Sequence, residues 1–401
     1  MRLLTAFSKQ FKPIRVDDSE RKTMRILTGG LTTSFRRFCE SMSKSLRLEL
    51  VETFLNLDRV DANIYRSKHL IPGIPDNPRV YGGQVVGQAM VAATKTIDDA
   101  YHPHSLHCYF ILGADRNMPI IYSVERVRDG NSFCTRFVKA IQNGANIFTC
   151  EISFQKDEKQ WISHQGAMPK VPRPESLRSI GELVSQEIKN DPSYAERVEC
   201  LRRMEHLPTT FDIRPVEPAK YLRKAATEAT YMCWVKAKEP IGEDSRLHLC
   251  TAAFISDSCM VSTALLPHVG KNFSLAMAVS LDHSMWFHQN KFCMDEWMLY
   301  ETDSRVAANS RALINGRMWS GDGQLVLSTA QEALIRGKVP RSFVRFPTSG
   351  SSFLNTINQE SCFIGTIILG DHHSFCRFEN LDQPLHAGLL LVSSDGDELR
   401  N

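Results

Sequence analysis

The chain has 401 residues and a hydrophobic content of 42%, which is ordinary for a globular protein of about two or three domains. Residues 1–50 contain 11 Lys and Arg against 5 Asp and Glu, whereas the remainder holds 37 against 40. A body this close to neutral lacks the basic surface that nucleic-acid binding requires, and no uncharged apolar run approaches the roughly 18 residues of a membrane span.

The 11 cysteines are scattered without a Cys-x-x-Cys pair, which argues against a zinc site and a disulfide framework. Neither a phosphate-binding loop nor a His-Glu-x-x-His motif occurs. We therefore expect reduced thiols in an intracellular compartment, and no metal or other cofactor.

Residues 1–48 form a basic leader that is rich in Arg, Lys, Ser and Thr. Its composition fits either a mitochondrial targeting segment or a disordered extension. The acidic residues Asp17, Asp18 and Glu20 argue against a clean targeting segment.

Residues 49–167 read as an N-terminal module that opens with a long buried helix over residues 81–93. Gly83 and Gly87 lie four apart and share one face of this helix, which favours close packing. Alternatively, the Gly82-Gly83 amides at the helix start form a donor site for an anion or a carbonyl oxygen. Four strand-like segments follow, at residues 104–111, 120–128, 133–142 and 146–155, with a hairpin signal at Asn143-Gly144.

Residues 168–225 begin with a Pro-rich, charged stretch and are interpreted as a linker. A charged amphipathic pattern over 177–200 predicts a helix on the surface.

Residues 226–337 read as a C-terminal module with a buried helix over residues 251–261 that carries Asp257. A buried carboxylate without partners costs several kcal/mol. Asp257 is therefore either capped by neighbouring amides at a helix bend or a functional group. The strand-like segments that follow are residues 280–287, 297–304, 310–319 and 324–335, with a hairpin signal at Asp322-Gly323.

The second module repeats the order of the first, so the sequence predicts an internal duplication. Residues 338–401 have no repeat partner and are expected to be a divergent tail. Within the second module, the run from Val279 to His288 mixes hydroxyl, carboxylate and imidazole groups with large aromatic side chains. We expect chemistry there.

Six stretches of the sequence together resemble the acyl-CoA thioesterase II family, which includes bacterial thioesterase II and the animal peroxisomal acyl-CoA thioesterase. They are residues 81–88, 104–110, 255–257, 264–268, 282–288 and 330–332, in family order. The resemblance implies an α+β double hotdog fold, in which two tandem modules each wrap an antiparallel sheet around a long central helix. It also implies hydrolysis of fatty acyl-CoA to free fatty acid and CoA.

The resemblance further implies that an Asp, a Ser and a Gln hold the attacking water, and by motif these are Asp257, Ser280 and Gln331. The chemistry of the three residue types agrees. Burial raises the proton affinity of a carboxylate while hydrogen bonds keep it ionised, which suits Asp257 as the base. A hydroxyl and an amide can fix the position of a water molecule but cannot take its proton. Backbone amides at a helix start would stabilise the oxyanion.

Four histidines are alternative bases, although a His at the end of a strand is more often structural. They are His104, His107, His283 and His288. The absence of a Gly-x-Ser-x-Gly elbow weakens a serine-hydrolase interpretation. A non-catalytic acyl-CoA-binding protein and an enoyl-CoA hydratase-type enzyme on the same fold stay open as alternative functions.

The resemblance implies an acyl-CoA substrate, a pseudo-dimeric subunit that can associate into a homo-oligomer, and the peroxisomal matrix as compartment. The sequence ends in Glu398-Leu399-Arg400-Asn401, which is not a Ser-Lys-Leu-type signal. The mitochondrion and the cytosol are therefore alternative locations.

Overall fold

The computed structural model describes residues 48–73, 78–191, 210–270 and 273–338, together with 391–392 and 398–399. Residues 1–339 form one compact unit and residues 340–401 a second. In the second, β14 (Leu391–Val392) pairs antiparallel with β15 (Glu398–Leu399). Almost all of the predicted leader, 1–48, and of the predicted tail, 338–401, lies outside the described residues.

The N-terminal half places one long helix against an antiparallel sheet with the strand order β1-β2-β4-β5-β6-β3. Its elements are η1 (Leu48–Leu55), β1 (Leu57–Asp61), β2 (Ile64–Ser67), α2 (Gly82–Thr94), β3 (Tyr101–Phe110), β4 (Ile121–Asp129), β5 (Phe133–Gln142) and β6 (Ala145–Lys156). The predicted helix and four predicted strands are confirmed. Asn143 and Gly144, with φ angles of 50° and 75°, form the predicted hairpin turn between β5 and β6.

The C-terminal half repeats this arrangement with the strand order β10-β13-β12-β11-β8-β7, and β9 pairs with β13. Its helices are η2 (Pro174–Ser176), α3 (Ile180–Asn190), α5 (Pro218–Tyr221), α6 (Ser245–Ser256), α7 (Met260–Leu265) and η3 (Leu266–His268). Its strands are β7 (Phe211–Pro215), β8 (Thr230–Ala237), β9 (Leu275–Ser280), β10 (Asp282–Phe287), β11 (Met298–Ala308), β12 (Arg311–Ser320) and β13 (Leu325–Gly337).

Two sequence predictions in this half were wrong in detail. The helix expected over 251–261 is interrupted, because α6 ends at Ser256 and α7 begins at Met260. The strand expected over 280–287 is divided between β9 and β10. The surface helix expected over 177–200 appears as α3, and the part of it from 192 lies outside the described residues. The module boundaries stay a prediction, since β7 lies inside the segment read as a linker.

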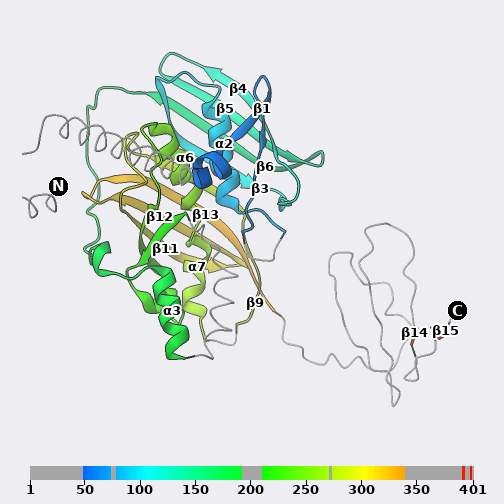
Figure 1. Cartoon of the computed structure of the whole chain (residues 1–401), viewed down its shortest axis with the longest axis vertical. Helices are drawn as coiled ribbons and strands as arrows, with labels where there is room; N and C mark the ends of the chain where they lie inside the picture. The colour runs from blue at the N-terminus through cyan, green and yellow to red at the C-terminus, as the bar shows by residue number, and fades with distance from the viewer. Residues whose placement is uncertain are drawn as a thin grey trace, which may run out of the picture. The chain divides into compact units, whose positions relative to one another are not determined.

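Strands β3 and β10 join the halves into one 13-stranded antiparallel sheet, with Cys108 opposite His283. Figure 1 shows the strands of the two halves, cyan in the first and green to orange in the second, next to each other. The fold is therefore the expected α+β double hotdog. Phe110 extends the join by donating its backbone N–H to the carbonyl of Leu281 at 2.9 Å.

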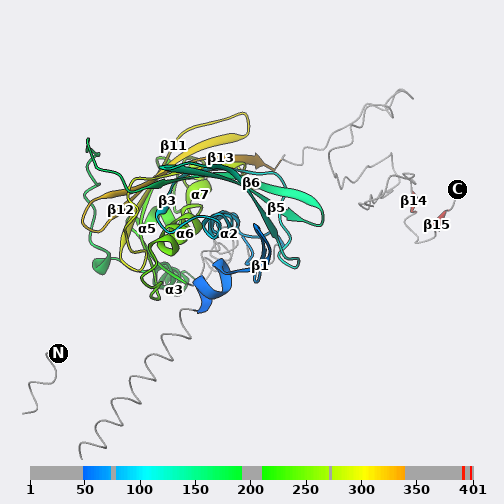
Figure 2. The ribbon, with the colours of Figure 1, turned by 90° about the horizontal axis from the view of Figure 1, so that it is seen from above.

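The helices α2 and α6 lie side by side within the curve of this sheet (Figure 2). Glycine makes their close approach possible, because a Cβ at Gly87 would lie 2.9 Å from Leu55 Cδ2 and 3.3 Å from the carbonyl of Cys250. The prediction that small residues of this helix allow close packing is confirmed, but Gly83 and Gly87 pack against the helix α6 and not against the sheet that was expected. The two helices run antiparallel, since Gly83 meets Phe254 and Gly87 meets Cys250.

One described helical stretch, Ser245–His268, is long and apolar enough to pass a composition test for a membrane span. It comprises α6, α7 and η3, and 83% of its most apolar window is buried inside the protein. Its apolar composition is that of a core helix.

Candidate active site

The site begins where α6 ends. Asp257 follows the last residue of α6, and Cys259 then takes a left-handed conformation with φ at 65° before α7 starts at Met260. A non-glycine residue in this region is strained and is often found at functional sites. The bend leaves the Asp257 side chain half-buried, at the end of a helix whose preceding turns are fully buried.

The Asp257 carboxylate receives hydrogen bonds from both halves of the protein. Its Oδ2 accepts the backbone N–H of Gly83 at 2.9 Å, in the first turn of α2. Its Oδ1 accepts the hydroxyl of Ser280 at 3.3 Å, at the end of β9. The positive end of the α2 dipole also favours a negative charge at this place.

Gly82 and Gly83 are required by this contact. A Cβ at Gly83 would lie 2.1 Å from the carbonyl of Phe254, and one at Gly82 would lie 2.8 Å from Asp257 Oδ2. Tyr81 holds the same junction, because its hydroxyl donates to the Phe254 carbonyl at 3.0 Å. Burial raises the pKa of Tyr81, so this hydroxyl keeps its proton. The Gly83 amide thus donates to an anion, as the alternative interpretation expected, but this anion is the Asp257 carboxylate of the protein itself.

A β-bulge between β9 and β10 shapes the other side of the site. Ser280 pairs with Ala333 of β13, and Ser284 pairs with Ala330. Residues 280–284 therefore lie opposite residues 330–333, so the first segment has one extra residue. In a regular strand, Ser280 and His283 would point to opposite faces of the sheet. The extra residue turns both toward the helices, as bulges near active sites commonly do.

Gln331 of β13 connects these two side chains. Its Nε2 donates to Ser280 Oγ at 2.7 Å, and its Oε1 lies 2.7 Å from Nδ1 of His283. On the far side of the imidazole ring, Nε2 of His283 lies 2.9 Å from the hydroxyl of Ser256, the last residue of α6. The structure therefore brings Asp257, Ser280 and Gln331 together, as the motifs predicted.

Burial divides this group into an edge and an interior. Asp257 and Ser280 are half-buried, whereas Gln331, His283 and Ser256 are each 0% exposed. Complete burial lowers the pKa of His283, although the nearby Asp257 carboxylate and the bond to Gln331 favour its charged form. A molecule that enters from solvent therefore meets the carboxylate and the hydroxyl first.

The other three candidate histidines lie outside this group. His104 bonds to Ser153, and His288 bonds to Ser328. His107 bonds to Ser284 and packs edge-on against Trp286, with ring centroids 5.4 Å apart. Each ring has a structural hydrogen bond to a serine hydroxyl. Sequence reasoning missed Ser256, for which its place beside Asp257 in the 255–257 motif was the available signal.

Within the described residues, His248, Cys293 and Asp295 are spaced closely enough to hold a metal ion. Existing hydrogen bonds already explain their arrangement. Nδ1 of His248 accepts the N–H of Met294 at 3.0 Å and its Nε2 donates to the carbonyl of Gly242 at 2.8 Å, while Asp295 accepts the N–H of Ile241 at 3.2 Å. With both ring nitrogens engaged, the histidine has no lone pair for a metal.

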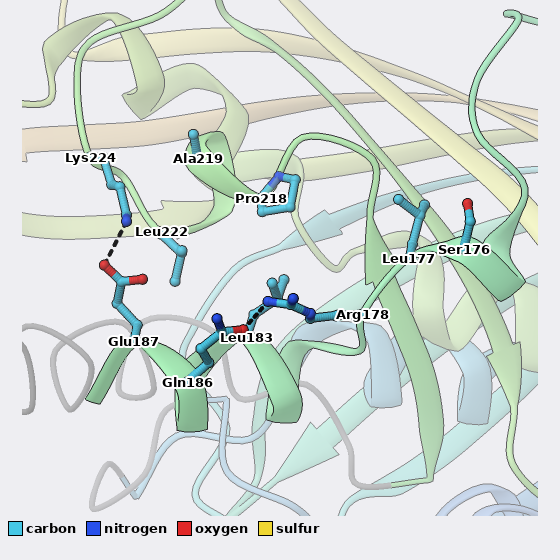
Figure 3. A pocket seen from close by; sticks show the side chains of 10 residues that line it. All are labelled: Ser176, Leu177, Arg178, Leu183, Gln186, Glu187, Pro218, Ala219, Leu222 and Lys224. Carbon is cyan, nitrogen blue, oxygen red and sulfur yellow. Dashed lines mark hydrogen bonds and ion pairs between the residues drawn. The ribbon is translucent and has the colours of Figure 1, made fainter. Parts of the chain in front are cut away.

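A cavity of about 570 Å³ lies between η2, α3 and α5 (Figure 3). Its polar side chains are paired with one another: Lys224 forms an ion pair with Glu187 at 2.6 Å, and Arg178 donates to Gln186. None of the Asp257 group lines it. The cavity therefore offers apolar surface, one neutralised ion pair and the guanidinium of Arg178, whose partner Gln186 is uncharged.

Comparison with known proteins follows the division into halves. A sequence profile described as "Acyl-CoA thioesterase N-terminal domain" matches residues 72–155, and one described as "Acyl-CoA thioesterase C-terminal domain" matches residues 174–335. The chain is 44% identical to "Acyl-coenzyme A thioesterase 8" of Rattus norvegicus, over 74% of this chain and 92% of the relative. It is 24% identical to "Peroxisomal acyl-coenzyme A thioester hydrolase 1" of Saccharomyces cerevisiae, over 73% of this chain and 96% of the relative.

Among solved structures, the chain is similar to an acyl-CoA thioesterase II from Mycobacterium marinum. The TM-score is 0.57 at 34% sequence identity, and the match covers 72% of this chain and 98% of the other.

Proposed function

The chain belongs to the acyl-CoA thioesterase II family and is a hydrolase of acyl-CoA thioesters, and from this premise we propose how its residues activate water. The attacking water binds at the half-buried edge formed by Asp257 and Ser280. Gln331, which is fully buried, holds Ser280 in place from behind. The observation that carries this proposal is the position of the Asp257 carboxylate, fixed by one hydrogen bond from each half of the protein.

Asp257 acts as the general base in this proposal. It accepts a proton from the water as the water oxygen bonds to the thioester carbon, which gives a tetrahedral oxyanion. The positive end of α2, whose first-turn amides lie at the site, favours the negative charge of that oxygen. Collapse of the intermediate breaks the carbon–sulfur bond, and the proton held by Asp257 passes to the departing CoA thiolate. Free acid and CoA leave, and the carboxylate is restored.

The test is thiol release from a series of acyl-CoAs by the intact protein and by Asp257→Asn. Loss of a general base lowers turnover by roughly 10²–10⁴-fold. The matched control is Asp244→Asn, because Asp244 is a carboxylate at the opposite end of the same helix, where it caps α6 through the N–H of Arg246 at 3.0 Å. Asparagine also caps helices well, so the control keeps its activity. Turnover by Asp257→Asn equal to that of the control removes Asp257 from the mechanism.

We also propose that the protein works in the peroxisomal matrix. The yeast relative carries that compartment in its name, and the sequence resembles the animal peroxisomal enzyme. The test is the location of the full chain, tagged in turn at each end, in cells with and without a working peroxisomal import receptor. A signal that stays in the cytosol or enters mitochondria in both cell types contradicts the proposal.

Association of this pseudo-dimer into a homo-oligomer is a further proposal. Its support is the exposure of two large side chains on the adjacent strands β3 and β10, Tyr109 at 61% and Trp286 at 39%. Sedimentation of the full chain, compared with a Tyr109→Ser, Trp286→Ser double variant, measures it. An intact protein that sediments as a monomer excludes the proposal.

A further inference from the structure

A continuous chain of hydrogen bonds runs through the buried part of the site and ends at the proposed base. It passes from Ser256 to His283 at 2.9 Å, to Gln331 at 2.7 Å, to Ser280 at 2.7 Å and to Asp257 at 3.3 Å. Its first and last members are adjacent in sequence, at the end of α6. The donor and acceptor at each step decide whether Ser280 donates its proton to the Asp257 carboxylate.

The amide of Gln331 fixes the direction in the middle of the chain. Its Nε2 faces Ser280 Oγ and donates to it, so its Oε1 faces the imidazole ring of His283. An amide oxygen can only accept a hydrogen bond. Nδ1 of His283, which lies 2.7 Å away, must therefore carry a proton.

The other ring nitrogen faces the hydroxyl of Ser256. Burial keeps the ring neutral, so Nε2 of His283 accepts the single proton of Ser256. The contact of Ser256 with the carbonyl of Ala253, at 3.0 Å, competes for the same proton. A charged ring would donate from Nε2 to Ser256 and still donate from Nδ1 to Gln331. The Nδ1 proton is thus required in either protonation state.

We propose that His283 is a positioning residue whose Nδ1–H holds the amide of Gln331 in the one orientation that leaves the Ser280 hydroxyl free to donate to Asp257. The proposal rests on the role of Asp257 given above. Because Ser280 Oγ already accepts a proton from Gln331, its own proton goes to the carboxylate.

The opposite tautomer of His283 would exchange donor and acceptor along this series of hydrogen bonds. With the proton on Nε2, Nδ1 of His283 would accept from the Gln331 amide nitrogen, and the amide oxygen would turn toward Ser280. Ser280 would then have two acceptors, Gln331 and Asp257, for one proton. The carboxylate would lose a fixed donor, and the water-binding edge would lose its defined geometry.

His283 does not serve as the base itself. It is 0% exposed, and two side chains, Gln331 and Ser280, separate its Nδ1 from Asp257 along the chain. Its effect is therefore expected in kcat, with little change in KM.

The first measurement is the ¹⁵N spectrum of the protein labelled at histidine, with the signal of His283 assigned by its loss in His283→Asn. The expected pattern is a protonated Nδ1 and an unprotonated Nε2. A neutral ring protonated at Nε2 overturns the proposal.

The second measurement compares His283→Leu with His283→Asn in kinetics. Leucine removes the donor, and kcat should fall about tenfold or more, as for other displaced catalytic groups. Asparagine places an amide N–H near the position of Nδ1 and should restore kcat to within about threefold of the intact protein. His104→Leu is the matched control, because His104 is a strand histidine with a serine partner outside the site. Equal losses in the two His283 variants contradict a positioning role.

Where His283→Leu does not fold, Ser256→Ala replaces it. This variant removes the donor to Nε2, so the ring should divide between its tautomers in the ¹⁵N spectrum while kcat falls. An unchanged spectrum together with unchanged kcat overturns the proposal. If Asp257→Asn is active, the proposed base is wrong, whatever tautomer of His283 is measured. If the ¹⁵N spectrum shows the other tautomer, the role of His283 is wrong, so the two failures are distinguishable.

Discussion

In the N-terminal half, Thr94 takes the place that Asp257 holds in the C-terminal half, since each follows the start of its central helix by the same number of residues. Thr94 is buried and donates its hydroxyl to the carbonyl of Met90, within its own helix, at 2.8 Å. Asp257 reaches out of its helix to Gly83 of the other half. At this position, the N-terminal half has a side chain that bonds to its own helix, and the C-terminal half has one that bonds to the other half.

The strands differ in the same way when residues are counted from the two hairpin turns. Gln331 corresponds to Ile152, which is 0% exposed and apolar. In the sheet register, Ser280 lies opposite Ala333 of β13 and corresponds to Pro103, which lies opposite Phe154 of β6 and has no hydroxyl. Among the described residues, the cluster of Asp257, Ser280 and Gln331 therefore lies in the C-terminal half. The N-terminal half contributes the start of α2, whose Gly83 amide donates to Asp257.

The sharpest way to test this difference is to give the C-terminal half the residue of the N-terminal half. Gln331→Ile removes the donor to Ser280 and leaves His283 without an acceptor, so turnover should fall roughly 10²–10³-fold, as for loss of a preorganised donor. The free energy of unfolding should fall by about 1–3 kcal/mol, the cost of an unpaired buried polar group. Thiol release and urea unfolding measure the two effects.

Ile152→Val is the control for that experiment. It should cost about 0.5–1.5 kcal/mol of stability through lost packing and leave turnover unchanged. A loss of turnover like that of Gln331→Ile would show that both halves are catalytic.

Gly83→Ala tests the contribution of the N-terminal half. The added Cβ would lie 2.1 Å from the Phe254 carbonyl, so α2 and α6 must separate. Overpacking of this kind costs about 1–3 kcal/mol, and displacement of the Asp257 donor should lower turnover roughly 10²-fold. Gly181→Ala, in α3 with open space around it, should instead gain about 0.5–1 kcal/mol. Full activity of Gly83→Ala would rule out the contact between the halves as a catalytic feature.

Ser280→Ala is compared with Tyr101→Phe, which removes a hydroxyl from β3 outside the site. Loss of the Ser280 hydroxyl frees one oxygen of Asp257, and turnover should fall roughly 10- to 100-fold. Tyr101→Phe loses only its hydrogen bonds at Gly130 and Asn131, about 1 kcal/mol of stability. The pair is compared by thiol release and thermal unfolding, and equal turnover in the two variants would contradict the assignment of Ser280.

The smallest expected effect concerns the pH dependence of stability. Burial lowers the pKa of His283 below the ordinary value of 6.5. The unfolded chain therefore binds a proton that the folded protein does not, and stability present above pH 6.5 is lost as the pH falls below that value. His283→Asn should make this loss shallower, by at most about 1.4 kcal/mol per pH unit, in urea unfolding at several pH values. An unchanged slope would mean that His283 is not neutral in the folded protein.

Much of the fold was predictable because its elements carry local signals. Residues 133–142 alternate in burial and end at Asn143-Gly144, and β5 has those bounds. Strands β1, β2, β7 and β8 were missed. The first three have only four or five residues, which give little periodicity, whereas β8 has eight. The three proposed site residues came from motifs and do lie together, while their roles stay a proposal.

Two features that shape the site had no local signal. The left-handed residue after Asp257 is Cys259, whereas a sequence pattern would lead one to look for Gly or Asn there. The bulge between β9 and β10 exists only in the pairing with β13, which depends on residues about fifty positions away. A regular strand would place Ser280 and His283 on opposite faces.

The bulge also determines which kinds of sequence change this enzyme can tolerate. A chain that kept Asp257, Ser280, His283 and Gln331 but lost one residue between 280 and 283 would retain every polar side chain of the site. Ser280 and His283 would then lie two residues apart in a regular strand, and strict alternation would direct both side chains toward the helices. The loss would remove the bend that the bulge gives the strand, but not the face that the two side chains share. Under the proposed mechanism, a relative aligned with a gap at this point therefore keeps the site, whereas a relative that replaces one of the four side chains does not.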